Sequence, residues 1–169
     1  MGQKPRVTLP AVERALAEAR GIAAGNPTVD AARERLGDRV GTEPDVGQAV
    51  RVTSGLGVEH LGVVIFRQGA AVDVWLGAGR VRRLSGREGD DAVSDASASE
   101  LPPALAAIAA GAVIFGSLYE GQRVRYEAPD GRAHEALLVE KCRYGALVLT
   151  DEDAGRKIMA VGFQGLSPA

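Results

Sequence analysis

The chain has 169 residues but only one cysteine, Cys142, which excludes a disulfide scaffold and a zinc site built from several cysteines. Aromatic residues make up only 4%, which argues against functions that stack bases on aromatic platforms. The longest apolar run, Ala104–Phe115, is 12 residues, too short for a membrane span. The N-terminus lacks the apolar core of a signal peptide. We therefore expect a cytoplasmic protein without membrane insertion.

An excess of charge of one sign is also lacking, because 20 basic and 22 acidic residues leave a net charge of −2. Nucleic acid is therefore an unlikely partner on electrostatic grounds. No nucleophile elbow, phosphate-binding loop, dinucleotide fingerprint or metalloprotease helix is present in the sequence. We predict no enzyme, no catalytic residue, no metal and no required cofactor. His60 and His134 lack metal-ligand spacing, and we interpret them as structural residues at strand starts.

Two helices are predicted over residues 8–38, where apolar residues recur at spacings of three and four. Thr8 is the expected cap of the first helix. Asn26 or Thr28 starts the second helix, and Gly37 ends it. A third helix is predicted after the capping-box pair Ser97 and Glu100. Its buried stripe is Leu101, Leu105, Ile108 and Ala112.

Short β-prone runs fill the rest of the chain, and we predict an α+β fold that is mainly β. In the first half these runs are Ala49–Thr53, Leu61–Phe66, Ala70–Leu76 and Arg80–Leu84. Residues 86–100 are small, polar and acidic, as in a flexible linker. The expected domains are an N-terminal helical segment (1–44), a first β-barrel (45–89), an acidic linker and helix (90–118), and a second β-barrel (119–169).

The two β regions share one pattern, which predicts an internal repeat. Gly47-Gln48-Ala49-Val50-Arg51 matches Gly121-Gln122-Arg123-Val124-Arg125 at an offset of 74 residues. From Gly69-Ala70, which match Gly145-Ala146, we expect the offset to become 76 after a two-residue insertion. Sheets this small expose their edges unless they close, so we expect two closed or nearly closed barrels.

A short motif in the second β region resembles the signature of bacterial PilZ domains, D-x-S-x-x-G followed by alternating apolar residues. Glu140 stands at the Asp position, Cys142 at the Ser position and Gly145 at the Gly position. The family's second motif, R-x-x-x-R, has two candidates in Arg83–Arg87 and Arg35–Arg39. The resemblance implies a tandem regulatory barrel, and generic SH3-like barrels fit the same strand pattern.

The resemblance also implies cyclic di-GMP as a ligand, although two of the three signature positions are substituted. The residues that would bind it are the basic cluster and the signature, namely Arg80, Arg82, Arg83, Arg87, Glu140, Cys142 and Gly145. Guanidinium groups hold phosphates bidentately and stack on purines. The alternative interpretation of the basic cluster is an edge strand neutralised by the acidic linker beside it.

Cys142 lies between Lys141 and Arg143, and neighbouring cations favour a thiolate. The alternative, which we favour, is a small strand residue that points inward while its charged neighbours point outward.

Trp75 and Tyr144 are candidate anchors for a protein partner, or else core residues of a small barrel.

The function predicted from the sequence is that of a non-enzymatic bacterial regulatory or adaptor protein. It binds another protein through an exposed strand edge or a groove between the barrels. The first alternative is a cyclic di-GMP receptor, and the second is a nucleic-acid-binding tandem barrel.

Overall fold

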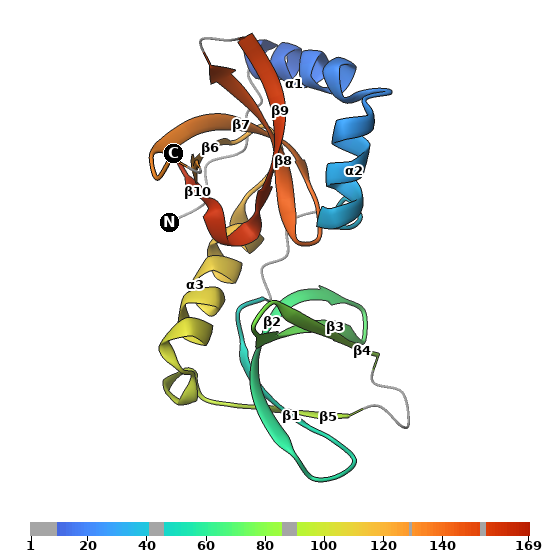
Figure 1. Cartoon of the computed structure of the whole chain (residues 1–169), viewed down its shortest axis with the longest axis vertical. Helices are drawn as coiled ribbons and strands as arrows, with labels where there is room; N and C mark the ends of the chain where they lie inside the picture. Colours follow the sequence, from blue (N-terminus) through green and yellow to red (C-terminus); the bar gives the residue numbers. More distant parts are fainter. Residues whose placement is uncertain (1–9, 41–45, 86–90, 129, 153–154) are drawn as a thin grey trace. The chain divides into compact units, whose positions relative to one another are not determined.

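The computed structural model describes residues 10–40, 46–85, 91–128, 130–152 and 155–169. These residues form two five-stranded antiparallel sheets and three α-helices (Figure 1), so the predicted class, mainly β with accessory helices, is confirmed. The chain divides into two compact units. The first-sheet unit comprises residues 41–118 and 163–166, and the second-sheet unit comprises residues 1–40, 119–162 and 167–169.

Two helices begin the second-sheet unit. They are α1 (Pro10–Ala23) and α2 (Pro27–Leu36). The expected cap Thr8 lies outside the described residues. Asn26 is the N-cap of α2, because its Oδ1 accepts the backbone N–H of Thr28 at 3.0 Å and that of Val29 at 3.4 Å. Gly37 follows α2 with φ +81°, a conformation that ends a helix most easily at glycine.

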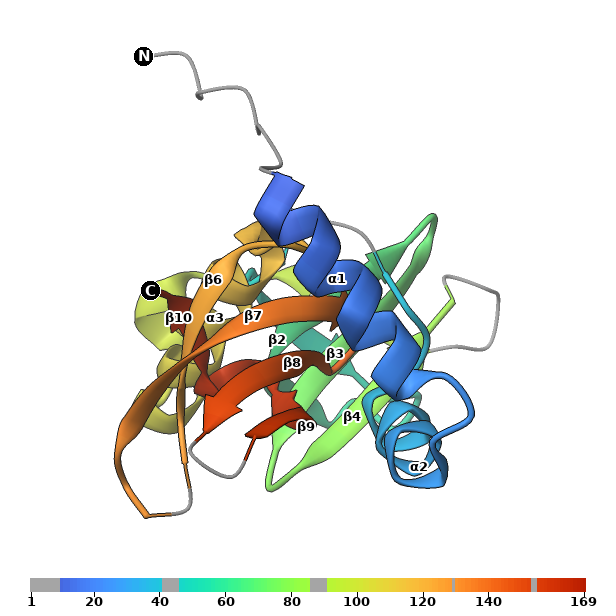
Figure 2. The ribbon, with the colours of Figure 1, turned by 90° about the horizontal axis from the view of Figure 1, so that it is seen from above.

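The second sheet has the strand order β10-β6-β7-β8-β9. The bounds are β6 (Arg123–Glu127), β7 (Ala133–Lys141), β8 (Gly145–Glu152), β9 (Gly155–Gly162) and β10 (Leu166–Pro168), with the 3₁₀ turn η2 (Phe163–Gly165) before β10. Figure 2 shows α1 crossing one face of this sheet. There Leu16 and Ala19 of α1 pack on Leu137, Val139 and Leu149. The second helix packs on the same sheet. Its buried residues Val29, Ala32 and Leu36 form one apolar cluster with Cys142 and Leu147.

The first sheet has the order β4-β3-β2-β1-β5 and is strongly curved (Figure 1), and it buries an apolar cluster of its own. Its strands are β1 (Ala49–Thr53), β2 (Glu59–Gln68), β3 (Ala71–Gly77), β4 (Arg80–Leu84) and β5 (Ala92–Asp95). The cluster consists of Val50, Val52, Val64, Val74 and Leu84. β5 lies inside the stretch 86–100 that was predicted to be a flexible linker, so that prediction is wrong for residues 92–95. The strand forms because its backbone pairs with β1, with Val93 opposite Val52.

The third helix, α3 (Pro103–Ser117), packs on β2, β3 and η2 of the first-sheet unit. The predicted residues Leu105, Ile108 and Ala112 are buried, and Leu101 precedes the helix. The Ser97–Glu100 capping box is present, but it caps the 3₁₀ turn η1 (Ala98–Glu100) instead of α3. Pro103 occupies the first turn of α3, where its missing N–H costs no helical hydrogen bond.

The pairing registers of the two sheets correspond closely. Ala49 lies opposite Val63 in the first sheet, and Arg123 lies opposite Leu137, 74 positions later, in the second. The N–H of Gly47 donates to the carbonyl of Val64 at 2.7 Å, and the N–H of Gly121 donates to the carbonyl of Leu138 at 2.8 Å. Both sheets also shift register just after these acceptor residues, between Val64 and Phe66 and between Leu138 and Glu140.

The predicted change of offset at Gly69-Ala70 is wrong. Val72 lies opposite Arg67, and Ala146 lies opposite Lys141, so the offset remains 74 through β3 and β8. The two sheets diverge only at the next hairpin, because β8 and β9 pair over eight residues whereas β4 has five. Aligning Gly69 with Gly145 placed the insertion in the turn between β2 and β3, whereas the two sheets differ in the hairpin that follows it.

The predicted closed barrels are not observed. The end strands are β4 and β5 in one sheet and β9 and β10 in the other, and no pairing joins either set of ends among the described residues. One physical reason is the length of β5 and β10, which have four and three residues and therefore offer few backbone groups to close a ring. Among the described helices, none combines the length and apolar character that a membrane span requires.

The compact units also differ from the domain boundaries expected from the sequence. The predicted separate helical segment clusters with the second sheet, about 80 residues away along the chain. Of the segment 90–118, predicted as linker and helix, the described residues 91–118 cluster with the first sheet. Each unit is thus a curled sheet with its outer face covered by helix, a two-layer arrangement that buries both surfaces of the inner strands.

Candidate functional site

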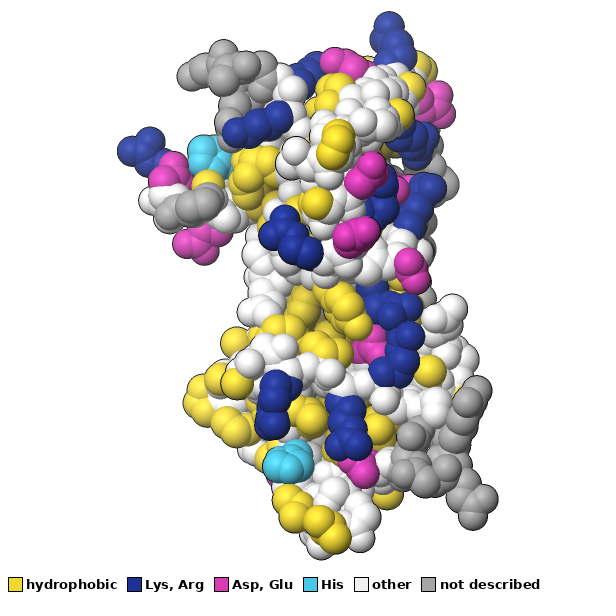
Figure 3. All heavy atoms as spheres, turned by 45° about the vertical axis from the view of Figure 1, so that its right-hand side comes forward, with side chains coloured by type: hydrophobic (Ala, Val, Ile, Leu, Met, Phe, Trp, Pro, Cys, Tyr) yellow, Lys and Arg dark blue, Asp and Glu magenta, His cyan; other side chains and the backbone are white. Residues whose placement is uncertain are grey.

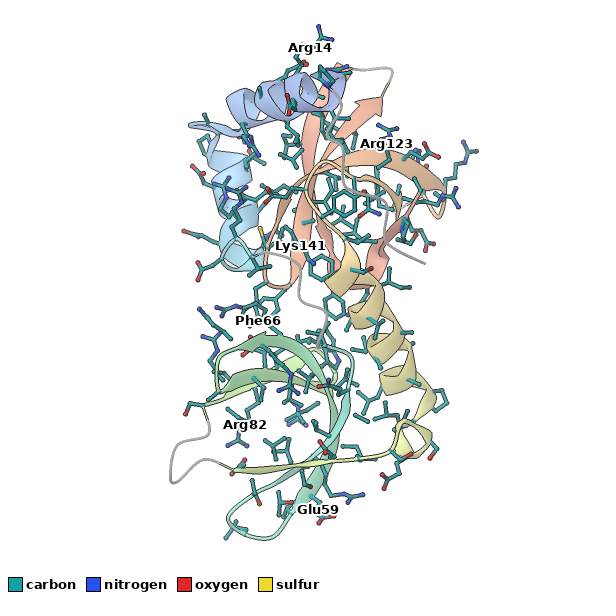
Figure 4. The ribbon with its side chains drawn as sticks, turned by 180° about the vertical axis from the view of Figure 1, so that it is seen from behind. Arg14, Glu59, Phe66, Arg82, Arg123 and Lys141 are labelled. Carbon is teal, nitrogen blue, oxygen red and sulfur yellow. The ribbon has the colours of Figure 1, made fainter. Side chains whose placement is uncertain are left out.

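The predicted basic cluster lies on the end strand β4 and is largely neutralised by acids. Arg83 Nε donates to Oδ1 of the buried Asp73 at 2.9 Å. Arg82 forms an ion pair with Asp91, and Figure 4 shows its position in the first-sheet unit. Arg80 is exposed, and Arg87 lies outside the described residues. These pairs support the interpretation of β4 as a charged edge strand.

The signature residues Glu140, Cys142 and Gly145 belong to the second-sheet unit, where a cleft of about 230 Å³ adjoins Glu140. Helices α1 and α2 form one wall of this arginine cleft, and β7 and β8 form the other. Its lining residues are Arg20, Ala23, Ala24, Gly25, Asp30, Arg33, Arg39, Val139, Glu140 and Leu147. Three arginines from separate segments therefore converge beside one signature residue.

Two bidentate arginine–carboxylate pairs dominate the cleft. Arg33 Nε donates to Glu140 Oε2 at 2.6 Å, and its Nη2 reaches Oε1 at 3.5 Å. Arg39 Nε donates to Glu120 Oε1 at 2.7 Å, and its Nη2 binds the other carboxylate oxygen. Arg20 lies 3.9 Å from Glu120, and Arg33 also contacts Asp30 at 3.1 Å. Each arginine of the cleft is therefore paired with at least one carboxylate.

The ionisation of these groups follows from the pairing. The hydrogen bond from Arg33 to Glu140 raises the pKa of Arg33 against the effect of burial, and Glu120 raises the pKa of Arg39 in the same way. Burial opposes ionisation of Glu120, but the hydrogen bond and charge of Arg39 outweigh it and hold the pKa of Glu120 below its ordinary value. Figure 3 shows basic side chains lying beside acidic ones on this unit. The positive charges of the arginines in the cleft are therefore balanced by the negative charges of the carboxylates that they contact.

The segment that follows α2 positions Arg39 by backbone pairing. Arg39 forms an isolated antiparallel bridge with Cys142, and the N–H of Val40 donates to the carbonyl of Lys141 at 2.7 Å. The N–H of Arg143 donates to the carbonyl of Asp38 at 2.9 Å. Of the two R-x-x-x-R candidates, Arg35–Arg39 is therefore the one that lies beside the signature residues within one unit.

Cys142 is fully buried, as the favoured interpretation predicts, but the expectation that its charged neighbours point outward is wrong, because Lys141 is only 1% exposed. Burial, and then the negative charge of Glu140, raise the pKa of its thiol to about 12. The Sγ atom lies 3.7 Å from Glu140 Oε2, and its S–H group donates to that carboxylate. Arg33 lowers this pKa but is outweighed by burial, so the surroundings of Cys142 favour the neutral thiol over the thiolate.

Gly145 is required by close packing. It lies opposite Gly162 on β9, and a Cβ at this position would collide with the carbonyl oxygen of Val161 and approach Leu36 Cδ2 to 2.7 Å. Gly145 thus lets α2 approach the start of β8, which keeps Arg33 and Glu140 within hydrogen-bond distance.

Neither predicted aromatic anchor is fully exposed. Trp75 is half-buried and packs edge-to-face on Phe163, with ring centroids 5.8 Å apart. Tyr144 is half-buried, and its N–H donates to the carbonyl of Leu36 at 2.8 Å. Their proposed role in partner binding stays a prediction. His134 stacks on Tyr126, with centroids 5.7 Å apart, near the start of β7.

A feature that the sequence did not single out is the edge of β9 that no other described strand covers. Thr150 lies opposite Lys157, and its Oγ1 donates to the Lys157 carbonyl at 3.3 Å, so that carbonyl points toward β8. The N–H and C=O of one strand residue point to the same side and alternate along the strand. Ile158 and Ala160 therefore direct their backbone groups away from β8. We call these groups, with those of Gly162, the β9 edge.

No protein-family model matches the chain, and none of the curated proteins compared with it shows a significant match.

Proposed function

We propose that the protein is a non-enzymatic adaptor that binds another protein by strand addition at the β9 edge. The observation that carries this proposal is the length and composition of β9. It is an end strand of eight residues, and residues 158–162 carry no charge. Among the described residues only β8 pairs with it. A long apolar edge is an efficient template for an incoming strand.

The contrast with β4 supports this choice of edge. β4 occupies the corresponding end of the first sheet, but it has five residues, and three of them are exposed arginines. Charged side chains on an edge strand hinder pairing with another chain. The two sheets therefore have similar strand orders but different edges: β4 carries three arginines in five residues, whereas the two cations of β9 lie at one end and residues 158–162 are uncharged.

The proposal includes duplication of an ancestral module, with each copy a PilZ-like or SH3-like half-open barrel. The shared strand order and the 74-residue offset between registers support it. The cytoplasmic location expected from the sequence stays a prediction.

A display library of short random peptides tests strand addition directly. We expect the full-length chain to enrich peptides with alternating apolar residues, which bind in an extended conformation. The variant Ala160→Pro removes an N–H that points away from β8, so it leaves the β8 ladder intact and abolishes binding. Arg20→Ala is the matched control and retains binding. Equal peptide binding by Ala160→Pro and the unmodified chain contradicts the proposal.

Cyclic di-GMP binding in the arginine cleft is the second candidate. It is favoured by the bridge that places Arg39 beside Cys142 and by the contact of Arg33 with Glu140. Three carboxylates already neutralise the three arginines, so the ligand must displace at least one of them. Calorimetric titration decides this candidate: it predicts heat that is lost in Arg39→Ala, and the absence of heat with the unmodified chain rules it out.

A further inference from the structure

We propose that the strand received by the β9 edge is β9 of a second copy of this chain, paired antiparallel about a two-fold axis at Met159. This inference rests on the proposed function, because it uses the same edge. It adds the identity of the partner and the register of the pairing.

The register follows from the direction of the backbone groups. A two-fold axis normal to a sheet places one residue opposite its own copy. Met159 points its backbone groups toward β8, because it is two residues from Lys157. A pair centred on Met159 therefore places Ile158 of one copy opposite Ala160 of the other, and both of these residues direct their backbone groups away from β8.

The distribution of charge selects the antiparallel arrangement. Both cations of β9, Arg156 and Lys157, lie at its N-terminal end. A parallel in-register pair places each cation beside its own copy, and like charges directly opposite destabilise a sheet. In the antiparallel register Lys157 lies opposite Val161, and Arg156 lies opposite Gly162. Arg156 also retains its ion pair with Glu18 of α1 at 2.5 Å.

The two faces of β9 also match in this register. Ile158 and Ala160 are half-buried and pack against the apolar clusters under α1 and α2. Met159 lies on the opposite face, 3.8 Å from the hydroxyl of Tyr126. Pairing at Met159 places the helix-covered faces of the two copies on the same side of one continuous sheet. The apolar cluster of each copy therefore continues into that of the other. No charged side chain is brought into either cluster by residues 158–161.

Light scattering coupled to size exclusion tests the dimer with the full chain. We expect a mass near that of two chains, which falls to that of one chain in Ala160→Pro. Circular dichroism and a thermal melt check that the variant is folded. A monomer at every concentration of the unmodified chain overturns the inference, and so does a dimer that Ala160→Pro leaves unchanged.

A cysteine at the two-fold axis tests the register independently. Cα atoms of a non-hydrogen-bonded antiparallel pair are about 4.5 Å apart, which suits a disulfide. Met159→Cys should therefore form a covalent dimer under mild oxidation. Ser94→Cys, on the exposed end strand β5 of the other sheet, should not. Cys142 is buried and does not compete. Failure of Met159→Cys to cross-link faster than Ser94→Cys contradicts the register.

The failure of this inference is distinguishable from the failure of the proposed function. If the unmodified chain is a monomer but peptide binding is lost in Ala160→Pro, the edge binds a different partner and only the dimer is wrong. If neither self-association nor peptide binding depends on Ala160, strand addition at β9 is itself wrong.

Discussion

Arg33 of α2 and Glu140 of β7 are 107 positions apart in sequence, yet the Arg33 Nε lies 2.6 Å from Glu140 Oε2. The pair attaches the helical layer of the second-sheet unit to its sheet. Glu140 is only 18% exposed, so its carboxylate depends on Arg33 more than a surface acid would.

We predict that this pair contributes measurably to stability. Glu140→Gln and Arg33→Gln should each lower the free energy of unfolding by about 1–2 kcal/mol, with a coupling of about 0.5–1 kcal/mol in a double-mutant cycle. Urea denaturation gives these values. Asp30→Asn is the control, because Asp30 contacts the same arginine from a more exposed position and should cost less. A coupling of zero between Arg33 and Glu140 would show that the contact contributes nothing.

Glu120 should make the stability depend on pH in the acid range. Its pKa is lowered in the folded chain from an ordinary value of 4.5, so its contribution is fully present above about pH 4.5. That contribution is lost as the pH falls through the lowered folded value. Glu120→Gln should therefore be less stable than the unmodified chain at neutral pH, and the difference should shrink as the pH falls below 4.5. A difference that does not change with pH contradicts this assignment.

Local signals in the sequence predicted local structure well. The bounds of β1 and β4 agree with the predicted runs, and the Asn26 cap and the buried stripe of α3 are confirmed. Each of these features depends on residues within one or two turns of the chain. Capping, periodicity and turn chemistry act over that range, so a single sequence suffices to find them.

Features that depend on distant residues were missed. β5 has only one large apolar residue, Val93, and becomes a strand because β1 supplies its backbone partners. The arginine cleft joins Arg33 to Glu140 and Arg39 to Glu120, and nothing near any of these residues marks its partner. The β9 edge follows from strand order, which the apolar pattern of Ile158–Val161 does not specify.

Cys142 should be unreactive in the folded chain. With its thiol pKa raised to about 12, mainly by burial, almost no thiolate exists near pH 8. A disulfide reagent such as dithionitrobenzoate should react slowly with the native chain and quickly after denaturation in guanidinium. Because the folded pKa is raised from 9.0, the stability from the buried neutral thiol should be lost only as the pH rises from about 9 toward 12. Rapid reaction of the native chain contradicts the burial.

The turn between β3 and β4 offers a stabilising substitution. Ala78 has φ +51° and Gly79 has φ +73°, and two successive positive values are typical of a hairpin turn that favours Asn-Gly or Gly-Gly. Ala78→Gly should raise the free energy of unfolding by up to about 1 kcal/mol, because the Cβ strain is removed. Gly79→Ala is the matched control and should lower it. If Ala78→Gly is destabilising, the loss of chain entropy outweighs the strain.

Gly145 and Gly162 lie opposite each other, but a side chain should be tolerated at only one of them. A Cβ at Gly145 meets the Val161 carbonyl and Leu36, both held by strand pairing and helix packing, whereas nothing lies within 4 Å of a Cβ at Gly162. Gly145→Ala should therefore lower the free energy of unfolding by about 1–3 kcal/mol, as overpacking does. It should also weaken the Arg33–Glu140 coupling, because α2 must move away from β8. Gly162→Ala should change stability by less than about 0.5 kcal/mol. Thermal melts of the two variants measure the difference, and equal effects would show that the approach of α2 to β8 does not depend on the missing side chain.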